Sequence, residues 1–209
     1  MNLSSIYLFF TNISLMTRNK KSVFSCIGAT SHSAYERESN DYYSTDPLAI
    51  RMLHKYNLLD KDVPYWETAC GNGVLSEELK RLGYDVISSD LFDRGYGYTG
   101  VDFFEQKKVF QGNTITNPPY KYINNWILHS LKITSNKVYI FCRIQTIESS
   151  ARYNKIFKNN PPTLICPFVK RIQCYRNNNT SLTSSAVCYA WFIWDNKDDS
   201  KETKVKWLI

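Results

Sequence analysis

The chain has 209 residues, of which 43% are hydrophobic and 15% aromatic, and its formal net charge is +7. This length and composition predict one globular domain with one substantial core, and they exclude an intrinsically disordered chain.

The first 33 residues are predicted to form a flexible extension. Their apolar patch at residues 6–10 is short, is broken by Thr11, Asn12 and Ser14, and lacks a positive leader. It is therefore a poor signal peptide and is too short to span a bilayer. Met16 begins a more ordinary N-terminus and is our candidate for the natural start. We expect a cytoplasmic protein that makes no membrane contact.

A glycine turn follows the first predicted buried strand. Residues 63–73 end in Gly71-Asn72-Gly73, a helix is predicted over 74–82, and a second strand over 84–89 ends in Asp90. Strand, Gly-x-Gly, helix, strand and acid form half of a Rossmann-like nucleotide site, in which the acid meets ribose hydroxyls. Because the third glycine of the dinucleotide fingerprint and a phosphate loop are missing, S-adenosylmethionine is the best candidate ligand. The alternative is a glycine turn in an ordinary α/β protein.

The tetrapeptide Asn117-Pro118-Pro119-Tyr120 follows a strand predicted over 113–116. The Asn117 side-chain oxygen and the Pro118 carbonyl can each accept one hydrogen of an aromatic amine, which localises the nitrogen lone pair for attack on an electrophilic methyl group. The prolines stiffen this stretch, and Tyr120 offers a face on which an extruded base can stack. The alternative is a proline turn after a strand.

The remaining elements complete an α/β pattern. A helix is predicted over 122–131 and a buried strand over 137–142. Strand-like runs at 163–175 and 185–194 predict an antiparallel hairpin that closes the sheet. The aromatic run at 189–194 suits a central core strand better than a platform for stacking bases. The polar tail, residues 195–209, is expected to fray at least to Val205.

Together these motifs resemble the N6-adenine-specific DNA methyltransferases, particularly their small phage-encoded members, over about residues 34–194. The resemblance implies a Rossmann-like class I methyltransferase fold: a mostly parallel twisted sheet with one antiparallel strand and helices on both faces, forming a single domain. It also implies methyl transfer from S-adenosylmethionine to the N6 amine of adenine in DNA. The catalytic residues would be Asn117, Pro118, Pro119 and Tyr120.

The resemblance also implies a set of cofactor-binding residues. In the family, a tyrosine followed by Thr-Pro lies over the methionine end of the cofactor, and here Tyr43 and Thr45 take that place, with Asp46 inserted before Pro47. The glycine loop matches the family's cofactor loop. By the same resemblance, Asp90 would bind the ribose of the cofactor and Asp102 would accept from its adenine amine. The complete implied set is Tyr43, Thr45, Glu67, Ala69, Gly71, Asn72, Gly73, Asp90, Leu91, Asp102 and Phe103.

Charge is distributed unevenly along the chain. Residues 36–120 carry 9 Lys/Arg against 14 Asp/Glu, a net of −5, whereas residues 121–194 carry 10 against one, a net of +9. This basic segment predicts salt-sensitive binding to nucleic acid, and the resemblance implies that this nucleic acid is DNA. The alternative is a set of separately solvated lysines and arginines. No large target-recognition domain fits in the chain, so residues 149–162 and 177–184 are the candidate recognition segments.

Cysteine and histidine spacing predicts neither disulfides nor a metal site. The six cysteines form no Cys-x-x-Cys pair and suit buried thiols in a reducing compartment, and the three histidines are scattered. The cysteines are Cys26, Cys70, Cys142, Cys166, Cys174 and Cys188.

Two functional alternatives stay open. The chain is either an enzyme on another nitrogen, such as an RNA base or a protein glutamine, or a non-catalytic nucleic-acid-binding protein with a methyltransferase fold.

Overall fold

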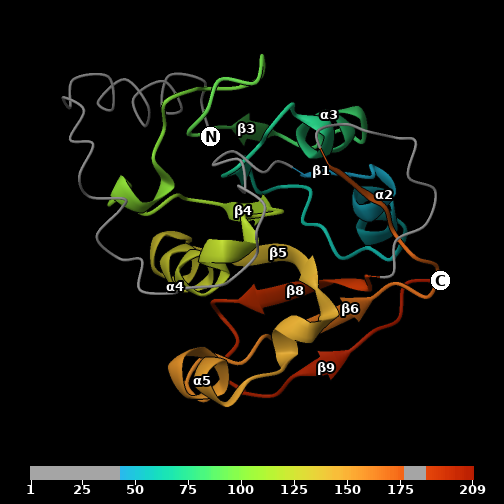
Figure 1. Cartoon of the computed structure of the whole chain (residues 1–209), viewed down its shortest axis with the longest axis vertical. Helices are drawn as coiled ribbons and strands as arrows, with labels where there is room; N and C mark the ends of the chain where they lie inside the picture. The colour runs from blue at the N-terminus through green and yellow to red at the C-terminus, as the bar shows by residue number, and fades with distance from the viewer. Residues whose placement is uncertain (1–42, 177–186) are drawn as a thin grey trace, which may run out of the picture. The chain divides into compact units, whose positions relative to one another are not determined.

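A seven-stranded sheet in the order β3-β2-β4-β5-β8-β6-β9 is the core of the fold (Figure 1). The computed structural model describes residues 43–176 and 187–209. The strands of this sheet are β2 (Tyr65–Glu67), β3 (Val86–Ser88), β4 (Asn113–Thr116), β5 (Lys137–Arg143), β6 (Leu164–Pro167), β8 (Tyr189–Asp195) and β9 (Lys204–Val205). A separate antiparallel pair joins β1 (Tyr43–Thr45) to β7 (Cys174–Arg176).

Helices connect these strands. The α-helices are α2 (Leu48–Lys55), α3 (Val74–Arg81), α4 (Ile123–Ile133) and the single turn α5 (Ser150–Arg152). The 3-10 turns are η1 (Phe103–Glu105), η2 (Tyr120–Tyr122) and η3 (Ile144–Ile147), and η4 (Tyr153–Phe157) is a π-helical turn. Gly83 lies just after α3 with φ +87°, a left-handed conformation that glycine adopts without strain, so the predicted helix stop is confirmed.

Strand directions confirm the predicted α/β architecture. Strand β2 runs parallel to both β3 and β4, and β4 runs parallel to β5. Only β8 is reversed within this described sheet: it pairs antiparallel with β5 and with β6, and β9 pairs parallel with β6. The carboxyl ends of β2, β3, β4 and β5 therefore meet at one edge, which is where ligands bind in open α/β sheets.

Helices cover both faces of the sheet. Tyr65, Ile115 and Tyr139 belong to the same buried cluster as Ile50 of α2 and Leu79 of α3. The next residue along β2, Trp66, points to the opposite face, where its ring meets those of Phe103 and Phe110, and Phe103 in turn stacks on Trp126 of α4. Alternation along strands explains this division, because successive side chains of a strand point to opposite faces.

The aromatic run near the C-terminus forms a buried strand. In β8, Ala190, Trp191 and Phe192 have no exposed surface, and Trp194 is 3% exposed. The indole nitrogen of Trp191 donates to the Ala49 carbonyl at 3.0 Å, which ties β8 to α2. The prediction of a core strand is therefore confirmed, and the stacking-platform alternative is excluded for the rings that are buried here.

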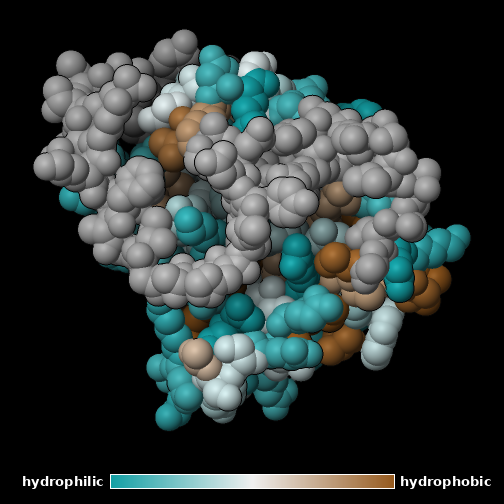
Figure 2. All heavy atoms as spheres, viewed as in Figure 1, coloured by the Kyte–Doolittle hydropathy of each residue, from teal (hydrophilic) through white to brown (hydrophobic). Residues whose placement is uncertain are grey.

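Two predicted segments differ in the structure. Residues 163–175 do not form one strand: β6 ends at Pro167, and the stretch from Cys174 pairs with β1 instead. The tail does not fray as far as Val205, because β9 pairs with β6 and Leu208 is 1% exposed. Apolar side chains gather near the C-terminus (Figure 2), where Val169 and Ile209 are exposed. The first 42 residues, with Met16, and residues 177–186 lie outside the described ranges.

All described residues belong to one compact unit, Tyr42–Ile209. Among them, no helix combines the length and apolar character that a membrane crossing requires. In the same ranges, no three His, Cys, Asp or Glu residues are grouped so as to hold a metal ion. The five described cysteines are free thiols: Cys70, Cys142 and Cys166 are buried as predicted, whereas Cys174 is half-buried and Cys188 is exposed.

Candidate functional site

The glycine turn lies at the carboxyl end of β2. Gly71 and Gly73 have φ values of +56° and +83°, which residues other than glycine rarely adopt. The Gly73 amide donates to the Cys70 carbonyl at 2.8 Å and closes the turn before α3. A Cβ atom added at Gly73 would lie 2.4 Å from the ring of Tyr96, so both conformation and close packing require glycine. Ala69 and Asn72 are half-buried within this turn.

Asp90 is held directly against the glycine turn. Its Oδ2 accepts from the Gly71 amide at 2.8 Å, and its Oδ1 accepts from the Phe92 amide at 2.9 Å. The side chain is 8% exposed, and the neighbouring Leu91 is 43% exposed. The structure thus brings together the glycine turn and the acid that the sequence assigned to ribose, and places an exposed apolar side chain beside them.

Glu67 is turned into the interior beneath α3. The Ser76 hydroxyl donates to its carboxyl group, and the same hydroxyl lies 2.6 Å from that of Ser88. Burial raises the pKa of Glu67 to about 8, although the bonds from Ser76 oppose the shift. Glu67 therefore supports the turn from below, linking β2, α3 and β3, and is not itself a surface group of the site.

The raised pKa of Glu67 predicts a pH-dependent stability. A raised folded-state pKa gives stability that is complete below the ordinary carboxyl pKa of 4.5 and is lost as pH rises to about 8. Glu67→Gln removes this titration. We expect the variant to be more stable than the wild type at pH 8, with the difference growing by roughly 1 kcal/mol per pH unit across the window. Urea unfolding at pH 5, 6.5 and 8 measures it. Exposed Glu105→Gln is the control, and parallel pH profiles for wild type and Glu67→Gln would refute the prediction.

Asn117 follows β4 at the same edge of the sheet. Strands β2 and β4 are parallel neighbours with Glu67 opposite Ile115, so the residues after each strand leave side by side. The indole nitrogen of Trp126 donates to the Thr68 hydroxyl at 3.1 Å, which ties α4 to the end of β2. Asn117 is half-buried, Pro118 is buried and Pro119 is exposed. The tetrapeptide and the glycine turn therefore lie at the ends of adjacent strands.

The segment before β2 reaches the tetrapeptide as well. The Asn117 side-chain nitrogen donates to the Thr45 hydroxyl at 2.8 Å, and Thr45 is 4% exposed. The inserted Asp46 also has a structural role: its Oδ1 accepts from the Leu48 amide at 2.8 Å, at the start of α2. Tyr43 lies in β1. The sequence did not predict the contact between Thr45 and Asn117, because 72 positions separate these residues.

Tyr120 is less open than the sequence suggested. The Arg143 guanidinium carbon lies 5.3 Å from the centre of the Tyr120 ring, and the Tyr189 ring lies 6.5 Å away. Burial raises the pKa of Tyr120 well above its usual range. A base could stack on this ring only if Arg143 moved aside or if the base approached from another side. Arg143 is exposed at the end of β5, and no sequence pattern beyond its place in the basic segment predicts its position over Tyr120.

Asp102 and Phe103 have different environments. Asp102 is half-buried and accepts from the Phe104 amide at 2.8 Å, while the Val101 amide donates to the Asp90 carbonyl at 3.1 Å. Phe103 is 2% exposed and stacks on Trp126 at 4.5 Å between ring centres. Its ring is part of the core, and the aromatic side chain exposed at this corner is that of Phe104. The bond between Val101 and Asp90 thus brings the backbone next to Asp102 close to Asp90, and the assignment of Asp102 to the cofactor stays a prediction.

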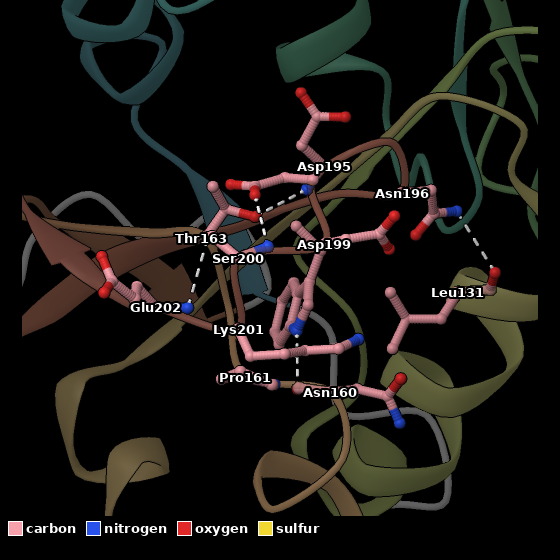
Figure 3. Close-up of a pocket in the computed structure, with 12 residues that line it drawn as sticks. Leu131, Asn160, Pro161, Thr163, Asp195, Asn196, Asp199, Ser200, Lys201 and Glu202 are labelled. Carbon is pink, nitrogen blue, oxygen red and sulfur yellow. Dashed lines mark hydrogen bonds between the residues drawn. The ribbon is translucent and has the colours of Figure 1, made fainter.

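A small cavity lies at the opposite edge of the sheet (Figure 3). Its volume is about 80 Å³, and Asp195, Asp198, Asp199 and Glu202 are among the side chains that line it. Asp195 pairs with Lys137, the first residue of β5, so this cavity lies at the amino end of that strand. Its lining includes none of the residues assigned to the candidate site, which lies at the carboxyl ends.

Comparison with known proteins supports the fold alone. No protein-family model and no curated protein sequence matches the chain. Solved structures with the same fold include "a putative RNA methyltransferase" from Pyrococcus horikoshii, with a TM-score of 0.51, 16% identity, and coverage of 71% of this chain and 82% of that one. A "predicted O-methyltransferase" from Agrobacterium tumefaciens has a TM-score of 0.51, 11% identity, and coverage of 78% and 84%.

A third similar structure is a modification subunit of "a putative type I restriction enzyme" from Vibrio vulnificus, with a TM-score of 0.51, 12% identity, and coverage of 79% of this chain and 47% of that one. These likenesses establish a Rossmann-like class I methyltransferase fold. The descriptions of the three proteins differ in what they act on, so the substrate has to be argued from the residues of the site.

Proposed function

We propose that this chain is an S-adenosylmethionine-dependent methyltransferase acting on the exocyclic N6 amine of adenine in DNA. The observation that carries the proposal is the side-by-side position of Asn117 and the glycine turn at the ends of β4 and β2. A methyl donor at the turn and an amine at Asn117 would be within reach of each other. The class I methyltransferase fold is consistent with this arrangement.

The residues around the glycine turn fit S-adenosylmethionine chemically. Ribose hydroxyls are donors, and the Asp90 carboxylate beside the turn is an acceptor that can receive further hydrogen bonds. Gly71 permits close backbone approach, the Tyr96 ring covers Gly73, and exposed Leu91 offers apolar contact. Asp102 would accept from the adenine amine of the cofactor. The bound cofactor would supply an electrophilic methyl group.

The tetrapeptide would activate the acceptor amine without a strong base. Asn117 uses its amide nitrogen as a donor to Thr45, which directs the amide oxygen away from Thr45 as the end that can accept from a substrate amine. The Pro118 carbonyl would take the second amine hydrogen, and the two acceptors would stabilise positive charge as it develops on nitrogen. Asn117 rather than serine favours adenine over cytosine, by the family resemblance.

The basic segment supports a nucleic-acid substrate. Some of its basic side chains bond within the protein, and the exposed ones are the candidates for contact with phosphates. Arg152 donates to Asn124 and to the carbonyls of Thr146 and Glu148, and Lys137 pairs with Asp60 at 2.7 Å, so both are used internally. The exposed basic residues in the described part of this segment are Lys121, Lys132, Arg143, Lys155, Lys158, Lys170 and Arg171. Arg143, beside Tyr120, is the best placed of them for a phosphate near an extruded base.

A labelled-methyl assay tests the proposal. Purified protein is incubated with S-adenosylmethionine carrying a labelled methyl group and, in parallel, with duplex DNA, RNA and a protein extract. We expect label in DNA, and we expect digestion to nucleosides to yield N6-methyladenine. Label only in RNA or in protein would replace the proposed substrate, and no transfer together with no calorimetric binding of S-adenosylmethionine would favour a non-catalytic binding protein.

A further inference from the structure

The orientation of the Asn117 side chain is fixed by a residue from a distant part of the chain. A carboxamide has an acceptor end and a donor end of nearly the same shape, and a half-turn about its bond exchanges them. Transfer to an amine requires the oxygen, and not the nitrogen, to face the substrate. In this structure the Asn117 nitrogen donates to the Thr45 hydroxyl at 2.8 Å, so the oxygen is the end that faces away from Thr45.

The neighbours of Thr45 explain why its hydroxyl accepts. A threonine hydroxyl can donate or accept, and by itself it would satisfy either orientation of the amide. Thr45 lies opposite Cys174 in the β1–β7 pair, so the two side chains lie on the same face and the sulfur can accept from the Thr45 hydroxyl. When the Thr45 hydroxyl donates its hydrogen to the Cys174 sulfur, its oxygen presents only lone pairs to Asn117. A lone pair can accept from the N–H end of the amide but cannot bind its oxygen.

The backbone around Thr45 is held at several points. Strand β1 pairs with β7 over all three of its residues, and the Asp46 amide donates to the Gln173 carbonyl at 3.2 Å. Thr45 is itself β-branched and 4% exposed, so its side chain has little rotational freedom. An acceptor held this firmly can orient Asn117 before the substrate binds. The entropic cost of orienting the amide is then not part of the reaction barrier.

We propose that Thr45 is a positioning residue for methyl transfer: it accepts the Asn117 amide hydrogen, with Cys174 behind it, and so turns the amide oxygen toward the substrate amine. The inference rests on the function proposed above. It gives Thr45 a role different from the contact with the methionine end of the cofactor that the family resemblance implied.

Three substitutions test this role. Thr45→Val keeps the β-branched shape and removes the hydroxyl, Thr45→Ser keeps the hydroxyl, and Thr45→Ala is a second variant without it. The matched control is Thr114→Val on β4, which removes a buried threonine hydroxyl bonded to Thr134 at 2.9 Å, at the start of the same strand that leads to Asn117. Steady-state transfer kinetics give kcat and the KM for the acceptor, and calorimetry gives the Kd for S-adenosylmethionine.

We expect Thr45→Val and Thr45→Ala to lower kcat about tenfold, the effect of losing one buried hydrogen bond to the reacting amide. The acceptor KM and the cofactor Kd should stay within about twofold, and Thr45→Ser should restore kcat. Thr114→Val should lower the melting temperature and leave kcat unchanged. An unchanged kcat in both hydroxyl-free variants would overturn the proposal, and so would a loss confined to cofactor binding.

A second measurement separates this inference from the proposed function. In ¹⁵N-labelled protein, the side-chain amide signal of Asn117 is identified by its disappearance in Asn117→Ala. We expect Thr45→Val to shift this signal and Thr114→Val to leave it in place. If the wild type transfers no methyl group to any acceptor, the proposed function fails while this signal still reports on positioning. If the Asn117 side-chain signal does not shift in Thr45→Val, the proposed positioning role of Thr45 is wrong.

Discussion

Asn117→Ala is expected to lower the rate of methyl transfer about a hundredfold or more, with little change in the Kd for S-adenosylmethionine. The substitution removes the acceptor that would stabilise charge on the amine nitrogen in the transition state, and loss of one such oriented group costs 10²–10³ in rate. It leaves Asp90 and the glycine turn in place, because their mutual hydrogen bond does not involve Asn117. Single-turnover transfer and calorimetry on the same preparation measure the two quantities.

A matched control separates this effect from the general loss of an asparagine. Asn125 is exposed on α4, and its side-chain oxygen accepts from Lys155 at 3.1 Å. Asn125→Ala should therefore retain transfer close to that of the wild type. Full activity in Asn117→Ala would show that the tetrapeptide is a structural turn and would remove the proposed chemistry.

Asp90→Ala is expected to show the converse pattern, in which cofactor binding weakens about a hundredfold before the rate at saturation changes. A hydrogen bond to a charged group contributes about 1.5–3 kcal/mol, and the ribose would lose its acceptor in this variant. A second cause adds to the first, because Asp90 also holds the Gly71 and Phe92 amides at 2.8 and 2.9 Å. Without the carboxylate, the glycine turn loses the partner that fixes it.

Asp93 offers the control for this second substitution. Its Oδ1 accepts from the Gly95 amide at 2.9 Å, an exposed turn of the same local kind as that at Asp90 but without contact to Gly71. Asp93→Ala should leave the Kd for S-adenosylmethionine unchanged. If Asp90→Ala binds the cofactor as tightly as the wild type, the ligand does not lie at this glycine turn.

Much of the fold was readable from local sequence because local forces determine it. The strand at residues 113–116, the helix from Val74 and its stop at Gly83 all follow from short apolar patterns and one left-handed glycine. The glycine turn and Asn117 each follow a predicted strand, and the carboxyl ends of parallel strands meet at one edge of a sheet. What defines these features lies within about ten residues of each.

The features that escaped prediction depend on pairings between distant residues. Residues 163–175 divide into β6 and β7 because the end of the run finds β1, more than a hundred positions earlier. Arg143 comes over Tyr120 only once β5 and the loop after β4 are both in place. Strand β9 has only two residues, both exposed, so its pairing with β6 has no signature in its own residues.

The position of β8 has a consequence for how the protein is made. This strand lies in the middle of the sheet, between β5 and β6, yet its residues leave the ribosome after those of both neighbours. Until β8 has been synthesised, one edge of the hydrophobic strand β5 is unpaired. Each nascent chain therefore passes through a stage in which it can aggregate with other chains. A frameshift or stop shortly before Tyr189 would make that stage permanent, yielding insoluble material rather than a weakened enzyme.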